Sequence, residues 1–263
     1  MKIKSALIDW LTLTSFDVGV YDFWSSLLSE QDGSIREGRV MMYLGAWSGN
    51  LFVGEGSQQG QAHYLLRVSG EDADVLAPRL YDLRAHASRI DLQITIELPP
   101  GYVAREFADR LREERTDRRR RITLIEDGAG SDTVYLGHRS SERYYRIYVK
   151  FDALGKPYLR FEVEFKGDVA PVVWRQIQFD ASPAAILASE IEHLGFDSAG
   201  VLRRFHAWLG GALHAKPHVV PTSEGATLRW LYSQVIPVLR RLLNSHDDGP
   251  RLRALLEELL QER

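Results

Sequence analysis

Strict alternation of apolar and polar residues marks three segments in the middle of the chain. In residues 89–98 every second position is isoleucine or leucine, and residues 143–151 and 158–166 repeat this period of two. Successive side chains of a strand point to opposite faces of a sheet, so the pattern predicts three strands with one buried and one charged face. Taken alone, it is typical of a one-sided antiparallel sheet whose outer face is held by cross-strand Arg–Glu pairs.

The other periodic segments alternate between strands and helices over the first 168 residues. β-Forming residues and intervening turns predict further strands at 6–16, 39–52 (interrupted by glycines), 62–69, 121–125 and 133–137. Apolar residues at helical spacing predict helices at 18–28, 71–85 and 102–116. Beyond residue 168 helical spacing prevails, at 169–178, 183–194, 199–213, 225–244 and 250–262.

This order of elements predicts an α+β fold in which helices cover one face of an antiparallel sheet, not a doubly wound parallel sheet. We expect a first domain over residues 1–168 and a helical C-terminal region over residues 169–263. Arginines beside leucine stripes leave three roles open for the C-terminal region, namely DNA binding, dimerisation or covering of the sheet.

Composition narrows the classes of chemistry. The 263 residues contain no cysteine, which excludes disulfide frameworks, thiolate nucleophiles and cysteine-ligated metals, so a metal ion would be held by oxygen or histidine. The net charge of −3, from 33 Lys and Arg against 36 Asp and Glu, gives no overall preference for nucleic acid. No apolar run reaches the roughly 18–20 residues of a membrane span, and no signal peptide is recognised, so we expect a soluble cytoplasmic protein without membrane contact.

The charged faces of the three strands carry the residue types of a phosphoryl-transfer site. Asp91, Glu162 and Glu164 are predicted on neighbouring strands, where carboxylates can hold one Mg²⁺ or Mn²⁺ ion. Tyr148 faces the same way, and a metal or cationic neighbours would favour the phenolate that attacks phosphorus. The cationic neighbours on its strand are Arg146 and Lys150. Tyrosine in a strand is also a common packing residue, so residue types alone leave both interpretations open.

Three blocks of residues follow one another along these strands. They are residues 89–92 (RIDL), residues 133–150 (TVYLGHRSSERYYRIYVK) and residues 159–166 (LRFEVEFK). In order and in register they resemble the replication initiation factor (Rep_trans) family, the initiators of rolling-circle plasmids with relatives in filamentous phages and mobile elements. The resemblance extends over residues 6–168 and includes the opening segment Ile8-Asp9-Trp10-Leu11.

The resemblance implies a metal-dependent enzyme that nicks and rejoins DNA to start rolling-circle replication. Tyr148 matches the nucleophile, which attacks a scissile phosphodiester, forms a 5′-phosphotyrosine and releases a 3′-OH that primes synthesis. The matching metal ligands, for Mg²⁺ or Mn²⁺, are Asp91, Glu162 and Glu164. The residues expected to neutralise phosphate charge are Arg146, Lys150 and Arg160.

The resemblance also implies further contacts with DNA. Gly137 would let the following loop approach the DNA closely, and the expected contacts are Arg139, Ser141, Arg143, Arg160 and the run Arg118, Arg119, Arg120 and Arg121. A solvated helix end beside acidic residues explains the arginine run about as well. The expected partners are single-stranded DNA or an extruded hairpin at a replication origin, a host helicase and a second copy of the chain.

Two positions depart from the family pattern, and one alternative function stays open. Thr95 stands where a second acid is frequent, which leaves open whether Glu164 or a histidine completes the metal site. Tyr145 stands where an apolar residue is usual, and its neighbour Tyr144 is expected to pack, to stack on a base or to act as a second acceptor. The alternative is a non-catalytic DNA-binding or regulatory protein of a plasmid or phage on the same fold. The presence of Tyr148 together with the acids argues for the enzyme.

Overall fold

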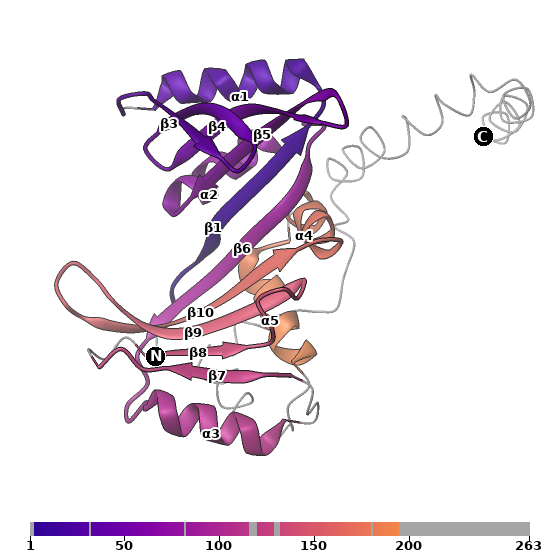
Figure 1. The fold of residues 1–263 in the computed structure, drawn as a ribbon. Helices are drawn as coiled ribbons and strands as arrows, with labels where there is room; N and C mark the ends of the chain where they lie inside the picture. The colour runs from indigo at the N-terminus through magenta and orange to yellow at the C-terminus, as the bar shows by residue number, and fades with distance from the viewer. Residues whose placement is uncertain are drawn as a thin grey trace, which may run out of the picture. The chain divides into compact units, whose positions relative to one another are not determined.

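Ten strands form one antiparallel sheet in the part of the chain that the structure describes (Figure 1). The structure is a computed structural model and describes residues 3–194, apart from positions 32, 82, 116–119, 129–131 and 180. In spatial order the strands are β2 (Arg36–Val40), β3 (Tyr43–Ser48), β4 (Leu51–Gln58), β5 (Gln61–Ser69), β1 (Ile3–Ser15), β6 (His86–Glu97), β10 (Pro157–Lys166), β9 (Arg143–Phe151), β8 (Thr133–Leu136) and β7 (Ile122–Ile125). Every neighbouring pair is antiparallel.

Helices cover one face of this sheet. They are α1 (Val18–Glu30), α2 (Glu71–Leu76), the short 3₁₀ helix η1 (Ala77–Leu80), α3 (Ala104–Glu114), α4 (Val169–Gln178) and α5 (Pro183–His193). Apolar residues of the central strands, such as Ile90, Leu92 and Phe161, are buried in one core with Trp24 of α1 and Trp174 of α4. The predicted α+β fold with one helix-covered face is therefore confirmed. We call the other face of the sheet the open face.

Two long central strands connect the halves of the sheet. β1 has 13 residues and β6 has 12, and they pair along most of their length, with register shifts that include one between Ile8 and Trp10. In Figure 1, α1 lies beside β3–β5 at one end of the sheet and α3 lies beside β7 at the other. The three blocks that carry the family resemblance occupy β6, β8–β9 and β10, which are neighbours in the sheet.

Two predicted elements differ from the structure because of local backbone chemistry. The single run predicted at 39–52 is the end of β2, all of β3 and the start of β4, because the chain reverses at Met41 and Gly49, which have φ angles of 52° and 57°. The helix predicted at 71–85 ends at Leu76 and continues only as η1, where Pro78 cannot donate a backbone hydrogen bond.

The C-terminal region is described only in its first part. Helices α4 and α5 match the predicted segments 169–178 and 183–194, and both pack on β6. The helices predicted at 199–213, 225–244 and 250–262 lie outside the described residues. The domain boundary at residue 168 and the role of the C-terminal region therefore stay predictions. Among the described residues, no helix combines the length and apolar character needed to cross a membrane.

The charged open face is more buried than the alternating pattern predicts. Asp91, Glu162 and Glu164 are only 1%, 3% and 6% exposed. They lie on β6 and β10, in the middle of a wide sheet, where long neighbouring side chains cover them. Phe151 was expected on the buried face but is 43% exposed, because it ends β9 at the edge of the core.

Candidate active site

The hydroxyl of Tyr148 lies beside a buried carboxylate on the open face. Tyr148 is opposite Arg160 of β10 and Thr133 of β8, and its hydroxyl donates a hydrogen bond to Oε2 of Glu162 at 3.1 Å. Burial, followed by the negative charge of Glu162, raises the pKa of Tyr148 to about 12. Tyr148 is therefore a neutral phenol at neutral pH unless a cation approaches it.

Two carboxylate oxygens converge on one guanidinium nitrogen. Nη2 of Arg146 donates to Oε1 of Glu162 at 2.6 Å and to Oδ2 of Asp91 at 2.8 Å. Burial raises the pKa of Glu162 to about 7, although the charge of Arg146 acts in the opposite direction. Burial also raises the pKa of Asp91 in spite of its hydrogen bonds from Arg89. Both carboxylates are thus held in a poorly solvated place around a positive charge.

Glu164 has a different environment from the other two acids. Its Oε1 lies 2.8 Å from Nζ of Lys166, and its Oε2 lies 3.2 Å from Nη2 of Arg89. Burial favours the neutral acid, but the hydrogen bond from Lys166 and the charge of Arg89 outweigh it and lower the pKa of Glu164. Glu164 lies opposite Asp91 in the sheet, so these two predicted ligands are neighbours. Their pKa values nevertheless shift in opposite directions.

The donor set fits a divalent cation held by two carboxylates. Mg²⁺ is commonly bound through one or two carboxylates and keeps several waters for a substrate phosphate. Asp91 and Glu162 already direct one oxygen each at Nη2 of the positively charged Arg146. Among the described residues, no group of three or more acidic or histidine side chains has the spacing of a complete metal site.

Arg160 is anchored next to Tyr148 by a residue that the family pattern left unexplained. Nε of Arg160 donates to Oγ1 of Thr95 at 3.1 Å, and Thr95 in turn donates to Gln93 at 2.7 Å. Nη1 of Arg160 lies 3.6 Å from Oδ1 of Asp9. Asp9 was not among the site residues predicted from the sequence. It lies at the register shift of β1 between Ile8 and Trp10, and from there its side chain contacts Arg160 of β10.

A cavity of about 370 Å³ opens beside Arg160 on the open face. Its lining includes Asp9, Thr95, Arg160 and Lys150, together with Lys4. Lys150 is exposed and lies opposite Tyr158, on the same face as Tyr148. The cavity therefore gathers positively charged and polar side chains around Arg160, which lies opposite Tyr148 in the sheet.

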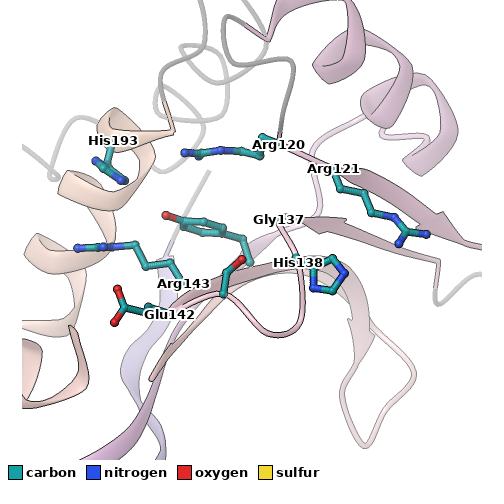
Figure 2. Close-up of a pocket in the computed structure, with 9 residues that line it drawn as sticks. Arg120, Arg121, Gly137, His138, Glu142, Arg143 and His193 are labelled. Carbon is teal, nitrogen blue, oxygen red and sulfur yellow. The ribbon is translucent and has the colours of Figure 1, made fainter. Parts of the chain in front are cut away.

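A second cavity of about 370 Å³ gathers several predicted DNA contacts on the helix-covered side (Figure 2). Arg120, Arg121, Ser141 and Arg143 line it with His193 of α5. Figure 2 shows Arg120 and Arg143 extending towards the helix that carries His193. The predicted DNA contacts are thus divided between two faces of the sheet.

Arg143 and Tyr145 are both tied to α5 beside this second cavity. Nε of Arg143 lies 3.2 Å from Oε1 of Glu190, and the hydroxyl of Tyr145 donates to Oε2 of Glu190 at 2.9 Å. Burial, with the charge of Glu190, raises the pKa of Tyr145. The polar residue at the position where the family usually has an apolar one is explained by this buried hydrogen bond to α5.

The loop between β8 and β9 carries the other predicted contacts. Gly137 has a φ of 95°, a conformation that favours glycine, and it begins the turn towards β9. Arg139 is exposed, and its carbonyl accepts a hydrogen bond from Lys166. Arg118 and Arg119 lie outside the described residues.

Tyr144 and two histidines of the sheet, His63 and His138, have partners outside the carboxylates around Tyr148. Tyr144 stacks on Tyr135 at a ring-centroid distance of 5.4 Å and an interplanar angle of 16°. Nδ1 of His63 is 2.7 Å from the hydroxyl of Tyr43, and Nδ1 of His138 is 2.8 Å from Oγ of Ser140. Neither histidine is hydrogen-bonded to the carboxylates around Tyr148.

Comparisons with known proteins give a likeness in fold. No family model matches the sequence, and no curated protein matches it. A solved structure described as a rolling circle replication initiator protein from Geobacillus stearothermophilus superposes with a TM-score of 0.54 over 73% of this chain and 85% of that chain, at 17% sequence identity. At this identity the comparison establishes that the described part of the chain is similar in fold to that initiator protein.

Proposed function

We propose that this protein is a rolling-circle replication initiator that nicks and rejoins one DNA strand through Tyr148. The observation that carries the proposal is the hydrogen bond from Tyr148 to Glu162, whose other oxygen converges with Asp91 on Arg146. The three blocks that resemble the initiator family meet at this point of the sheet, and the fold is similar to that of a rolling circle replication initiator protein.

The nicking step would transfer a DNA phosphate to the tyrosine. Oη of Tyr148 attacks the phosphorus while its proton passes to Oε2 of Glu162, which is partly ionised at neutral pH. The bond from phosphorus to O3′ breaks, and O3′ takes a proton from solvent. The products are a 5′-phosphotyrosine and a free 3′-OH, and the reverse reaction rejoins the strand.

This step needs positive charge beyond what the resting site supplies. Burial raises the pKa of Tyr148 to about 12, well above the pKa of about 7 of Glu162, so transfer of the phenol proton to the carboxylate is unfavourable in the resting site. Asp91 and Glu162, with Glu164 as the third predicted ligand, would hold Mg²⁺ or Mn²⁺. When bound, the ion would stabilise the phenolate and the charge on the phosphoryl oxygens.

The basic residues have separate tasks in this proposal. Arg160 faces Tyr148 and would contact a non-bridging phosphate oxygen, and Arg146, on the same strand and face as Tyr148, would help neutralise the phosphate charge. Lys150 would contact the DNA at the mouth of the open-face cavity. The second cavity, with Arg120, Arg121, Ser141 and Arg143, would bind another part of the same DNA, as would Arg139 in the adjoining loop.

The decisive experiment detects the covalent product and its polarity. The full chain is incubated with Mn²⁺ and a pool of randomised single-stranded oligonucleotides, labelled at either the 3′ or the 5′ end, and separated on a denaturing gel. We expect 3′-labelled DNA alone to migrate with the protein, because the tyrosine keeps the 5′-phosphate of the downstream fragment. The adduct should vanish in Tyr148→Phe and persist in the matched control Tyr144→Phe. An adduct that survives Tyr148→Phe would refute the assignment of the nucleophile.

One observation favours the alternative of a DNA-binding protein that does not nick. Arg89 and Arg146 together balance the charges of Asp91 and Glu162, so these acids are paired without a metal ion. Tight binding of single-stranded DNA without an adduct, in Mg²⁺ and in Mn²⁺, would support this alternative. An origin hairpin, a host helicase and a homodimer stay expectations from the family resemblance, as does a plasmid or phage source.

A further inference from the structure

A layered group of aromatic and basic side chains lies on the open face, away from Tyr148. The guanidinium carbon of Arg67 on β5 is 4.0 Å from the ring centre of Trp10 on β1 and 5.5 Å from that of Trp47 on β3. The guanidinium carbon of Arg89 on β6 is 4.5 Å from the same Trp10 ring. We call Trp47, Arg67, Trp10 and Arg89 the stacked row.

Sheet register places the stacked row on the same face as the candidate active site. Thr12 of β1 is opposite both Arg67 and Arg89, and Trp10 is opposite Asp91. Residues directly opposite each other in a sheet point to the same side. Thr95 of β6 is in register with Arg160 of β10 and, through it, with Tyr148 of β9. Arg89 is six residue steps from Thr95 along β6, so it lies about 20 Å from Tyr148 in the strand direction.

Arg67 differs from Arg89 and Arg146 on the same face in its charge environment. Arg89 binds both oxygens of Asp91, and Arg146 binds Asp91 and Glu162. Within the described part of the chain, the guanidinium of Arg67 makes no hydrogen bond and no ion pair, although it is half-buried. Burial and the charge of Arg89 lower the pKa of Arg67, as expected for a cation without an anionic partner.

The two tryptophans hold this unpaired cation in a fixed orientation. Trp47 packs with Phe52 and the small open-face cluster that also contains Val40, and the indole N–H of Trp10 donates to Thr12 at 2.8 Å. A guanidinium held flat against aromatic rings keeps its N–H groups in one plane, which matches two oxygens of a phosphate. The Arg67 guanidinium thus lies against the Trp10 ring, and its residue is only partly buried.

We propose that Arg67 binds a backbone phosphate of the single-stranded DNA whose scissile bond lies at Tyr148, with Trp10 and Trp47 as positioning residues. This inference rests on the proposed function, because DNA is the ligand that connects the two places. The strand would cross β10, β6 and β1 and reach β5, about 20 Å along the strand direction and four strand spacings of about 4.8 Å each across the sheet from Tyr148. Arg67 would then contribute to affinity for a long strand and not to the chemistry of the nick.

The test measures DNA affinity and its salt dependence in full-length variants. Fluorescence anisotropy is recorded with labelled oligonucleotides of about 16 and about 4 nucleotides, a range typical of single-strand binding sites. For Arg67→Gln we expect about tenfold weaker binding of the longer strand and a salt slope that is smaller by about 0.7, the value of one lost phosphate contact. Arg67→Lys should lose most of this affinity too, because an ammonium lacks the planar fork. The matched control Arg175→Gln, an exposed arginine of α4, should bind as the wild type does.

The outcomes separate this inference from the proposed function. Equal DNA affinity and equal salt slope for the wild type and Arg67→Gln would overturn this inference. If the covalent adduct still forms, the proposed function would stand in that case. Wild-type affinity in Arg67→Lys would overturn the requirement for a stacked guanidinium. Weaker binding by Arg67→Gln in a protein that never forms an adduct would refute nicking and support the phosphate contact. Unfolding curves of Arg67→Gln, matched to those of the wild type, would exclude loss of fold as the cause of weaker binding.

Discussion

Glu162→Gln should change how the stability of the protein depends on pH. The pKa of Glu162 is about 7 in the folded protein against 4.5 for the free side chain, because burial disfavours the carboxylate. The folded state therefore holds a proton that the unfolded state loses between about pH 4.5 and 7. Stability from this group is complete below pH 4.5 and is lost as pH rises through 7. The difference in pKa corresponds to about 3 kcal/mol at 1.36 kcal/mol per pH unit.

Urea unfolding of the full chain between pH 4.5 and 8, followed by tryptophan fluorescence, measures this effect. The free energy of unfolding of Glu162→Gln, relative to the wild type, should rise by up to about 3 kcal/mol from the acid to the alkaline end, since glutamine does not titrate. Glu164→Gln is the matched control: its neighbours lower the pKa of Glu164, so this group's contribution is already complete near pH 4.5 and the relative stability of Glu164→Gln should stay nearly constant up to pH 8. A difference between Glu162→Gln and the wild type that does not vary with pH would refute the reasoning.

Three further predictions test the site piece by piece. Mn²⁺ should raise the thermal unfolding midpoint of the wild type but not that of Asp91→Asn. The control Glu97→Gln, which removes an acid at the end of β6, should respond to Mn²⁺ as the wild type does. Equal shifts in all three proteins would argue against the metal site. Thr95→Val removes the hydroxyl that accepts a hydrogen bond from Arg160. It should lower the free energy of unfolding in urea by about 1–2 kcal/mol and slow adduct formation several-fold. Thr95→Ser should restore both the stability and the rate. Tyr145→Phe should cost about 1 kcal/mol in the same assay and leave adduct formation unchanged, because its hydroxyl serves only Glu190 on the helix-covered side.

Local periodicity was enough to predict the strands of the site. In β9 and β10 alternation separates the apolar positions, such as Ile147 and Val163, from Tyr148 and Glu162 on the other face, and the structure has both strands as predicted. The same parity places Arg143 on the side of Tyr145. The alternating pattern therefore indicated that Arg143 and Tyr148 lie on opposite faces of the sheet. The prediction that grouped all the DNA contacts together did not use this information.

Contacts between distant parts of the chain were not accessible to such reasoning. An alternating pattern does not reveal how many strands lie on each side of β6. Asp91 is buried because β6 is a central strand of a wide sheet, and this burial raises the pKa of Asp91. The convergence of Asp91 and Glu162 on Arg146 depends on the register of three strands. Asp9 reaches Arg160 across β6 from a strand at the beginning of the chain, next to a register shift that leaves no mark in the hydrophobic pattern.

Under the proposed function, charge on the open face explains how a chain with a net charge of −3 would bind DNA. The three buried acids are matched by three cations: Arg89, Arg146 and Lys166. In the described part of the chain, Arg67 and Lys150 have no such carboxylate partner, so this face has an excess of positive charge. Screening limits surface charges to about 8–10 Å at physiological salt, so a DNA strand on this face responds to these cations more than to distant acids.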